Sequence, residues 1–469
     1  MRNPEYNNNT PLVTMIQKHF EGCHVSFSMP GHKSGMGFDG SIFEATGKYD
    51  ASEVFSSPFS EDTYDALHKA EALAAEAFGA KDTIFSCGGS SVPIVSAIFA
   101  LSRENKNWLI ERSCHKSIYE GMAMSGVEPH YIYPKLDEEN FIIQKISPEE
   151  VKAELKDGES MIFTYPDYYG RCLDGESISR MVHEKGGFVL TDSAHGAHLP
   201  FSTYFPPDAS KFADVWIQSA HKTLPALTQS AYLHASSKEL GDMIRRAYTA
   251  ISTTSPSYIL LASLDHAREY MSTIGKDRLE KLYHLLATAR MALRDMGYKV
   301  DFTGKEHGIY HDFSRLTIDV SPLGISGYSA RDALELDGFF PEMADMRRVV
   351  LLTSVCDDSH TISSIVKAFS QLARNANKFP PIKDFGAPMP RPTPKYAPKE
   401  AFFGKIQLVP LKEAVGRTAA GVITVYPPGL AAYTYGEEIS SEGVDYLTYI
   451  SSNGGHISGL YSGKIPVLA

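Results

Sequence analysis

Short apolar runs recur through the first half of the chain, and helical or loop stretches separate them. A helical pattern rich in alanine precedes the first run, from Tyr64 to Phe78. Each run has the length of a buried strand, and the stretches between them are long enough for crossover connections. This alternation predicts an α/β domain with a mostly parallel sheet covered by helices on both faces. The predicted strands are Asp82–Ser86, Trp108–Ile110, His130–Tyr133, Met161–Thr164, Phe188–Leu190 and Val215–Ile217.

The pattern changes in the second half of the chain. Residues 257–296 are almost continuously helical, with a break near Gly275, and suit a connector between domains. Two strand candidates, 315–320 and 349–353, flank a further helix, which is typical of a small α+β domain. A proline-rich stretch then indicates a linker. The predicted domains are an N-terminal arm (1–50), a large domain (51–265), a connector with a small α+β domain (266–378), the linker (379–398) and a C-terminal domain (399–469).

Composition and charge narrow the class of protein. The 469-residue chain carries a net charge of −11, which disfavours a nucleic-acid surface and is compatible with a cationic small-molecule substrate. No apolar run approaches the ~18 residues of a membrane span, and Met1–Thr10 is polar, without the apolar core of a signal peptide. The five cysteines are odd in number and widely scattered, which indicates a reducing compartment. The sequence thus predicts a cytoplasmic protein that binds neither membranes nor nucleic acid.

An acid and a lysine follow two neighbouring strand candidates. Asp192 comes directly after the apolar run 187–191, and Lys222 lies shortly after Ile217. Such a pair could hold a pyridoxal phosphate ring, with the carboxylate on the pyridinium nitrogen and the amine bonded to the aldehyde carbon as a Schiff base. The alternative is a solvated surface lysine. The apolar segment 224–227 favours a partly enclosed site, where burial lowers the pKa of a lysine.

A glycine-rich turn could hold a phosphate group. Residues 87–91, Cys-Gly-Gly-Ser-Ser, follow the first strand candidate and precede a helix with proline in its first turn. Glycines allow close backbone approach, and the free N–H groups of a helix start, together with the hydroxyls of Ser90 and Ser91, suit an anion. An ordinary capped strand–helix turn is the alternative. Ser219 and His221, close to Lys222, can also donate to a phosphate.

Histidines offer a stacking group and a metal hypothesis. His115 follows the Trp108–Ile110 strand candidate, so it is expected at the ligand-binding edge of the sheet, where its imidazole could stack on a pyridine ring. A histidine hydrogen-bonded within a loop is the alternative for a lone His. Asp192, His195 and His198 could ligate a metal, but the turn between them disfavours a common face and no clear fourth ligand is present. No metal site is predicted.

In this order, the motifs resemble those of the pyridoxal-phosphate-dependent ornithine/lysine/arginine decarboxylases in their shorter bacterial form. The resemblance covers nearly the whole chain. It implies the aspartate-aminotransferase fold, fold type I of the pyridoxal-phosphate-dependent transferases, with a cofactor-binding large domain at 51–265 and small α+β C-terminal domains. Its further landmarks are Pro30–Lys33, Tyr165–Gly170, Leu224–Gln229, Tyr426–Gly429 and Gly454–Ile457.

The resemblance also assigns roles to residues. It implies that Lys222 forms the internal aldimine, Asp192 pairs with the ring nitrogen and His115 stacks on the ring. It implies a homodimer with active sites between subunits, or a higher homo-oligomer, and a place in polyamine biosynthesis. The residues expected to hold the phosphate or to lie beside the cofactor are Ser90, Ser91, Ser219, His221 and His195.

Two departures from the family pattern concern the substrate. Family members usually carry an acidic pair shortly after the segment matching 50–53, where this chain has Ser57–Ser60. Near the C-terminus, where Pro-Gly-Glu is typical, it has Tyr435-Gly436-Glu437. Glu437 keeps the acid and is the candidate substrate-binding residue. If the missing acids position the distal cation of the substrate, specificity is altered here.

The predicted reaction is decarboxylation of ornithine, lysine or arginine to the corresponding amine and carbon dioxide, with Lys222 or His221 returning a proton to the α carbon. Two alternatives stay open. Another pyridoxal phosphate reaction on this fold, by an aminotransferase or lyase, would ordinarily use an arginine of the small domain for the substrate carboxylate, and Arg347 and Arg348 are candidates. The other alternative is a non-catalytic binding protein, which the two departures suggest and the retained Lys222, Asp192 and His115 argue against.

Overall fold

The structure is a computed structural model, and its chain divides into two compact units. Unit 1 comprises residues 1–97, 193–203 and 207–278, and unit 2 comprises 98–192, 204–206 and 279–469. The residues that the structure describes are 9–22, 29–38, 40–52, 63–137, 142–300, 310–379, 389–426 and 429–469.

Unit 1 contains three wholly buried strands in the order β1-β10-β9, namely β1 (Asp82–Ser86), β10 (Ala231–Ala235) and β9 (Val215–Gln218). Both pairings are antiparallel. The sequence predicted β1 and β9 but not β10. His234 interrupts the apolar run of β10, and it is tolerated in the core because Thr83 Oγ1 lies 2.9 Å from its Nδ1.

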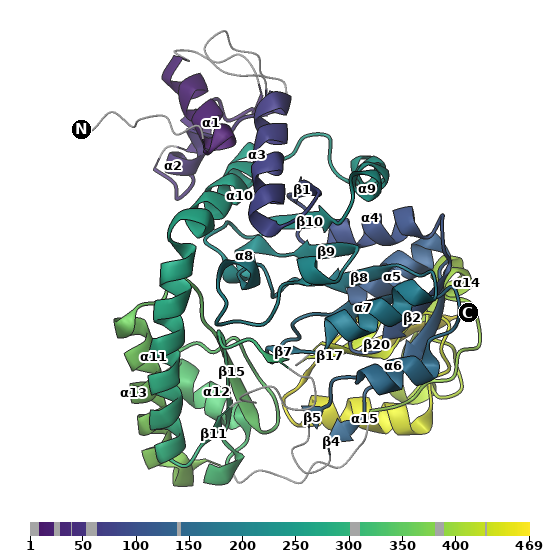
Figure 1. Cartoon of the computed structure of the whole chain (residues 1–469). Coiled ribbons are helices and arrows are strands. Elements are labelled where there is room, and N and C mark those ends of the chain that lie inside the picture. The colour runs from purple at the N-terminus through teal and green to yellow at the C-terminus, as the bar shows by residue number, and fades with distance from the viewer. Residues whose placement is uncertain are drawn as a thin grey trace. The chain divides into compact units, whose positions relative to one another are not determined.

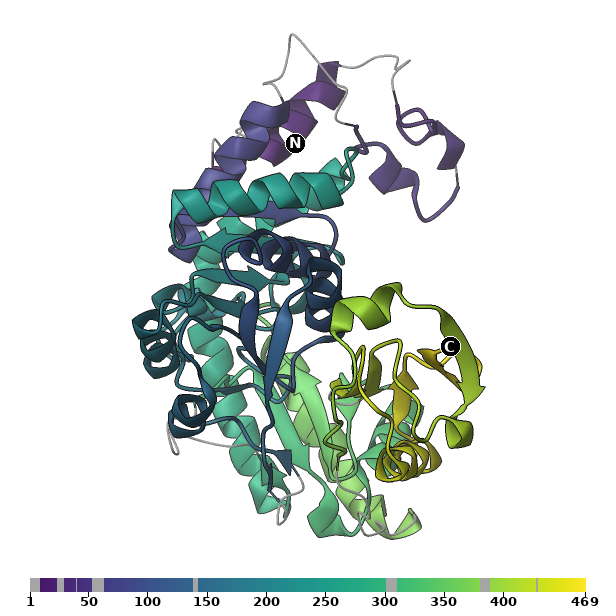
Figure 2. The same ribbon diagram turned by 90° about the vertical axis from the view of Figure 1, so that its right-hand side faces the viewer.

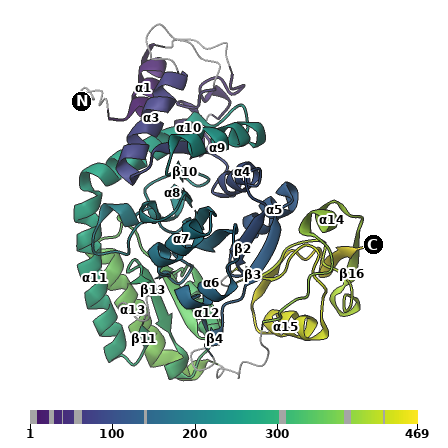
Figure 3. The same cartoon turned by 45° about the vertical axis from the view of Figure 1, so that its right-hand side comes forward.

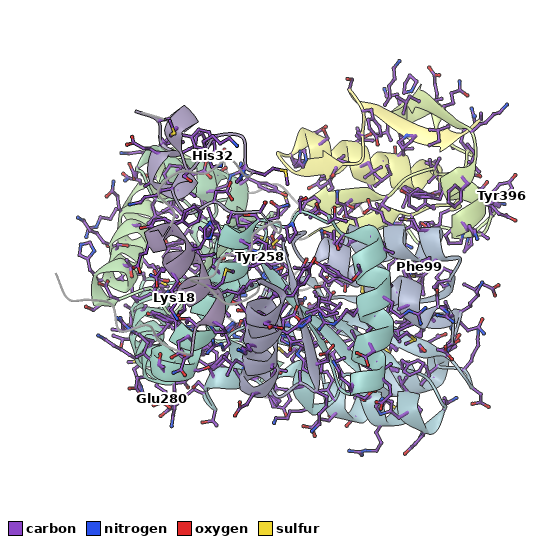
Figure 4. All side chains as sticks on the ribbon, turned by 90° about the horizontal axis from the view of Figure 1, so that it is seen from above. Lys18, His32, Phe99, Tyr258, Glu280 and Tyr396 are labelled. Carbon is purple, nitrogen blue, oxygen red and sulfur yellow. The ribbon has the colours of Figure 1, made fainter. Side chains whose placement is uncertain are left out.

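Three helices of unit 1 pack together, α1 (Pro11–Gly22), α3 (Thr63–Phe78) and α10 (Tyr258–Tyr270) (Figure 1). The Leu12 backbone N–H donates to the Asp265 carboxylate at 2.9 Å, which ties the start of α1 to α10. Tyr258, marked in Figure 4, is buried in the first turn of α10. The remaining helical elements of this part are α2 (Glu44–Gly47), α4 (Ser91–Leu101), α8 (Ala220–Thr223), α9 (Lys238–Ile251) and the 3-10 turns η1 (Met36–Phe38), η2 (Leu199–Phe201) and η3 (Ala209–Lys211).

Unit 2 begins with a parallel sheet in the order β8-β6-β2-β3. All its pairings are parallel, so the strands end at one common edge. Helices lie between the strands along the chain, as a crossover topology requires. This confirms the mostly parallel sheet that the apolar pattern predicted. The elements are β2 (Asn107–Glu111), α5 (Lys116–Ser125), β3 (Glu128–Ile132), α6 (Pro148–Glu154), β6 (Ser160–Thr164), α7 (Gly175–Glu184) and β8 (Val189–Asp192).

The second part of unit 2 is a four-stranded antiparallel sheet in the order β11-β13-β15-β14, with helices on it (Figure 3). Buried side chains such as Leu286, Leu316 and Phe369 form its core. A π-helical turn, η4 (Met271–Gly275), joins α10 to α11, which confirms the predicted break near Gly275. The elements are α11 (Lys276–Asp295), β11 (Lys299–Val300), β13 (Arg315–Asp319), η5 (Ser321–Leu323), α12 (Gly327–Leu336), β14 (Met343–Ala344), β15 (Arg348–Leu352), α13 (Ser359–Asn375) and η6 (Ala376–Lys378).

The C-terminal part of unit 2, lime to yellow in Figure 2, has its own core around Ile423, Tyr433 and Leu447. It holds a two-stranded sheet, β16-β20, and a three-stranded one, β18-β17-β19. Its elements are α14 (Pro398–Phe403), β16 (Ile406–Pro410), η7 (Leu411–Glu413), β17 (Ile423–Tyr426), β18 (Leu430–Tyr433), α15 (Ser441–Ser452), β19 (His456–Ser458) and β20 (Lys464–Leu468). Short strands elsewhere in unit 2 are β4 (Leu136–Asp137), β5 (Ile142–Ile143), β7 (Arg171–Cys172) and β12 (Tyr310–His311).

The described fold does not test every prediction made from the sequence, and the untested ones stay predictions. The domain boundaries predicted from sequence are one case. Others fall on residues outside the described ranges: the N-terminal residues 1–8, the Ser57–Ser60 departure, residues 380–388 of the proline-rich linker, and residues 427–428. Among the described residues, no helix combines the length and the apolar character that crossing a membrane requires.

Candidate active site

Lys222 lies on a short helix that directly follows a buried strand of unit 1. All of β9 is buried, Ser219 follows it, and α8 then carries Lys222. The Lys222 amine nitrogen Nζ lies 3.2 Å from Nε2 of His195, whose side chain is also buried. An ammonium can only donate, so the imidazole accepts at Nε2. The structure therefore brings together two of the predicted site residues, and a proton can be shared between them.

The glycine-rich turn of unit 1, which the sequence proposes as a phosphate site, has a residue in the left-handed region at its centre. Gly89 has a positive φ of 61°, and a Cβ added there would meet nothing within 4 Å, so open space lies in front of this backbone. Its N–H donates to the Gln229 carbonyl at 2.9 Å, which ties the turn to the segment after Lys222. Ser90 and Ser91 stand next to Gly89 and at the first position of α4. Both are at least partly exposed.

Two further side chains of unit 1 fit an anionic group. The Ser219 hydroxyl is completely buried, yet it has no hydrogen-bond partner among the residues that the structure describes. Buried hydroxyls are normally satisfied, so this one indicates a missing acceptor. His221 Nδ1 lies 2.8 Å from the Ser230 carbonyl and must donate to it, which leaves Nε2 for a ligand. These donors, with the Gly89 turn and the Lys222 amine, fit an aldehyde-bearing phosphate ester such as pyridoxal phosphate.

In unit 2, Asp192 and the His115 loop lie at the same edge of the parallel sheet. Asp192 ends β8 opposite Thr164 of β6. The Thr164 hydroxyl donates to Cys114 Sγ at 3.8 Å, and Cys114 directly precedes His115. Burial, with Glu111 nearby, raises the pKa of the Cys114 thiol well above its usual value, so this cysteine stays a neutral thiol. The strand ends thus place Asp192 and the loop that carries His115 at one edge of the parallel sheet. That both side chains contact the cofactor stays a prediction.

His115 is held as a neutral imidazole. It caps α5, and its Nδ1 accepts from the Ser117 backbone N–H at 3.3 Å and lies 2.9 Å from the Ser117 hydroxyl. Because a backbone N–H can only donate, Nδ1 carries no proton and Nε2 does. A neutral ring held at a helix start is a suitable flat surface for an aromatic ligand.

A buried ion pair supports this edge of unit 2, and the sequence reading missed it. The Lys145 amine lies 2.7 Å from the Glu111 carboxylate at the end of β2, and both side chains are almost fully inaccessible. Burial alone would lower the pKa of Lys145, but the neighbouring Glu111 carboxylate raises this pKa above its usual value, so the amine stays charged. The second Glu111 oxygen accepts from the Thr164 N–H at 3.0 Å. The sequence signal that could have revealed this pair is Glu111, a charged residue at the end of an apolar strand.

Glu437, the candidate substrate-binding residue, is paired inside unit 2. Its two oxygens lie 2.6 Å and 2.7 Å from the guanidinium nitrogens of Arg112, and the second also accepts from the Thr434 N–H at 2.7 Å. Arg112 further stacks over the Tyr131 ring, 4.8 Å from its centroid. These contacts anchor the C-terminal part to the strand end that leads into His115. A role for Glu437 in binding substrate stays a prediction.

The Arg112–Glu437 pair predicts a large loss of stability on truncation. Glu437→Ala should lower the free energy of unfolding by about 3–5 kcal/mol, because it leaves the buried guanidinium uncompensated. The adjacent Glu438, which pairs with Lys395 at the surface, is the matched control, and Glu438→Ala should cost at most about 1 kcal/mol. Urea unfolding followed by circular dichroism measures both. Equal losses for the two variants would contradict the anchoring role.

The structure also describes Arg348, which was considered for an aminotransferase, and the side chains that were considered for a metal site. Arg348, a candidate for the carboxylate of an aminotransferase substrate, lies in β15 with its guanidinium 3.4 Å from the Asp345 carboxylate. Among the described residues, no group of three or more His, Cys, Asp or Glu side chains is arranged to hold a metal ion.

The sequence of the chain matches one enzyme family along most of its length. It matches the major domain of the Orn/Lys/Arg decarboxylases over residues 10–307 and their C-terminal domain over residues 382–462. An arginine decarboxylase of Bacillus subtilis is 31% identical, with 93% of each chain covered.

Solved structures share the fold. Lysine decarboxylase A from Pseudomonas aeruginosa superposes with a TM-score of 0.82 at 19% identity, covering 98% of this chain and 80% of that one. Serine palmitoyltransferase from Sphingomonas wittichii superposes with a TM-score of 0.54 at 16% identity, covering 70% of this chain and 81% of that one. The predicted fold class, fold type I of the pyridoxal-phosphate-dependent transferases, is therefore confirmed. The chain belongs to the Orn/Lys/Arg decarboxylase family, as its motifs predicted, and its enzyme class is that of the amino-acid decarboxylases.

Proposed function

We propose that this protein removes the α-carboxylate of a basic amino acid, with pyridoxal phosphate held on Lys222. The observation that carries the proposal is the Lys222 amine, placed on a short helix after a buried strand and 3.2 Å from an accepting imidazole nitrogen of His195. Such a pair provides an amine that can lose its proton and become a nucleophile. Membership of the decarboxylase family supports the same reaction.

The proposed roles in cofactor binding can be stated for each unit separately. In unit 1, Lys222 would bond to the aldehyde carbon. The buried Ser219 hydroxyl, which has no partner in the described part of the chain, would donate to the phosphate. The Gly89 turn, Ser90, Ser91 and His221 would donate to the same group, and a protonated His221 would add a positive charge. In unit 2, the Asp192 carboxylate would hold a proton on the ring nitrogen, and neutral His115 would cover the ring face.

The chemistry divides between the group and the protein. Pyridoxal phosphate, when bound, supplies an electron sink for the electron pair that the departing carboxylate leaves behind. The Asp192 carboxylate would pair with the ring nitrogen and would so favour the protonated form of the ring. Lys222 Nζ and His195 Nε2 hold one proton between them, and this proton can return to the α carbon once carbon dioxide has left. His221 stays the second candidate for that proton.

Arginine is the substrate that we propose first. The Bacillus subtilis relative named arginine decarboxylase is covered along 93% of its length, and the net charge of −11 suits a cationic amino acid. Lysine and ornithine have the same α-amino and α-carboxylate groups, and each carries its cation on a shorter side chain than arginine. The homodimer, the cytoplasmic location and the place in polyamine biosynthesis that the resemblance implies stay predictions.

A panel of amino acids tests the proposed function. The purified, cofactor-loaded protein should release carbon dioxide and the matching amine in equal amounts from arginine, lysine or ornithine, with the highest kcat/KM for arginine. Neutral and acidic amino acids should react at least about a hundredfold more slowly, because they lack the distal cation that distinguishes the basic amino acids. Keto acid without carbon dioxide would instead indicate an aminotransferase. A protein that takes up no cofactor and turns over none of the panel would indicate a non-catalytic relative.

A further inference from the structure

Gln218, the last residue of β9, is fully buried and hydrogen-bonded on every side. Its amide nitrogen Nε2 donates to the Gly196 carbonyl at 3.3 Å and to the Asp208 carboxylate at 2.9 Å. Its oxygen Oε1 lies 3.2 Å from Nε2 of His234. All of these residues belong to unit 1, and none was singled out in the sequence. The available signal was a polar residue at the end of an otherwise apolar buried strand.

The partners determine how the Gln218 amide is turned. A backbone carbonyl can only accept, so the nitrogen must face Gly196 and the oxygen must face His234. Nε2 of His234 therefore carries the proton, and its Nδ1 accepts from the Thr83 hydroxyl at 2.9 Å. Burial lowers the pKa of His234 to about 3, so the imidazole stays neutral at physiological pH. The hydrogen-bond partners therefore fix both the orientation of the Gln218 amide and the tautomer of the His234 ring.

The network is closed to solvent. Gln218 and His234 are fully inaccessible, and Thr83 is nearly so. The Trp216 ring stacks on the His234 ring with centroids 5.1 Å apart, and the Phe78 ring lies at 4.9 Å. Without water to replace a lost partner, each bond is costly to break, so the network holds one geometry.

This geometry reaches the reactive amine through two short connections. Gly196 directly follows His195, and the Gly196 N–H donates to the Ser193 carbonyl at 2.8 Å, which closes a tight turn. On the other side, the chain runs from Gln218 through Ser219 to Lys222. Gln218 thus joins the two backbones whose side chains meet in the His195–Lys222 contact.

We infer that Gln218 is a positioning residue that acts through His195: by fixing the turn 193–196, it keeps His195 Nε2 against the Lys222 amine. The catalytic meaning of this inference rests on the proposed function, in which that amine bonds to the cofactor and moves a proton. The placement of the amine itself does not depend on the reaction that the protein performs.

A set of variants separates positioning from stability. Gln218→Met keeps the length of the side chain and removes its hydrogen bonds. Tyr232→Phe is the matched control, because Tyr232 stands opposite Gln218 in the β9–β10 pair and its hydroxyl makes a buried hydrogen bond to the Leu264 carbonyl at 2.6 Å. His195→Phe removes the imidazole through which Gln218 is inferred to act, and the double variant with Gln218→Met tests that dependence. Gln218→Glu, of the same shape but without the donors, serves if Gln218→Met does not fold.

The primary readout is the reactivity of Lys222 in the full-length chain after removal of bound cofactor. Competitive acetylation by acetic anhydride, with peptide mapping, compares Lys222 with the exposed Lys238. Gln218→Met should change the relative labelling rate of Lys222 at least about threefold, toward the rate measured in His195→Phe. The double variant should label at the same rate as His195→Phe alone. Tyr232→Phe should leave the rate unchanged. In the cofactor-loaded enzyme, Gln218→Met should lower kcat about tenfold with little change in KM.

Two results would overturn the inference. The first is a Lys222 labelling rate that Gln218→Met does not change, or that Gln218→Met changes by the same factor in the wild-type protein and in His195→Phe. The other is the same shift in Tyr232→Phe, which would assign the effect to stability alone. A wild-type protein that releases no carbon dioxide from any amino acid would overturn the proposed function instead, and the labelling rates would still decide the role of Gln218.

Discussion

Replacing Lys222 with alanine is expected to abolish carbon dioxide release and the visible absorbance of the bound cofactor together. The amine is the only group placed on α8 that can bond to an aldehyde, and it already faces a proton acceptor, His195 Nε2, at 3.2 Å. The loss should exceed about 10³-fold in kcat, equivalent to more than about 4 kcal/mol of barrier. The measurement is carbon dioxide release at saturating arginine and cofactor, with absorbance spectra of the same samples.

Lys238 provides the control for that variant. It is an exposed lysine of unit 1 whose amine pairs with Asp82 at 2.9 Å, away from α8. Lys238→Ala should keep the spectrum and at least half of the wild-type kcat. Turnover by Lys222→Ala at a rate close to that of Lys238→Ala would refute the assignment of Lys222 as the cofactor lysine.

Replacing Asp192 with asparagine is expected to give the second largest loss. Asparagine keeps the shape of the side chain, but it removes the negative charge that would hold a proton on the ring nitrogen. Loss of one preorganised electrostatic contact of this kind typically slows catalysis by about 10²–10³-fold. Asp192→Asn should also bind pyridoxal phosphate more weakly, while Lys222 still attaches it. The kcat and the cofactor dissociation constant, measured by titration, give both effects.

Asp174 offers the matched change. Its side chain caps α7 by accepting from the Ser177 N–H at 3.1 Å, and asparagine is an equally good cap. Asp174→Asn should therefore leave kcat and cofactor affinity unchanged. If Asp192→Asn behaved in the same way, the carboxylate would have no part in the chemistry.

The strand ends that carry the chemistry could be predicted from the sequence because apolar runs mark buried strands well. Lys222, Asp192 and His115 each follow such a run within a few residues, and the structure places Asp192 at the end of a strand and the other two four residues beyond one. The order of the motifs then identified the family. Local signals were sufficient where one strand and the turn after it decide the position of a residue.

What the sequence could not reveal depends on partners that lie far apart in the chain. Glu437 is a substrate-binding candidate because the family resemblance has an acid at this place, and its pairing with Arg112, more than three hundred residues away, could not be read from the sequence. The strand β10 escaped notice because His234 breaks its apolar run, and only Thr83 and Gln218 explain why a histidine is tolerated there. Hydrogen-bond satisfaction of buried polar groups is a tertiary property, and residue spacing does not encode it.

The central claim is that the aldehyde of pyridoxal phosphate bonds to one particular lysine, and chemical trapping tests it directly. Borohydride reduction of the cofactor-loaded wild-type protein, followed by proteolysis and mass spectrometry, locates the pyridoxyl group on the chain. We predict a single modified peptide that contains Lys222, and much less of that peptide when borohydride is added during turnover at saturating arginine, because the amine of the substrate then takes the place of Lys222 on the aldehyde carbon. A pyridoxyl group on any other lysine, or an unmodified Lys222 in protein that carries the cofactor, would contradict it.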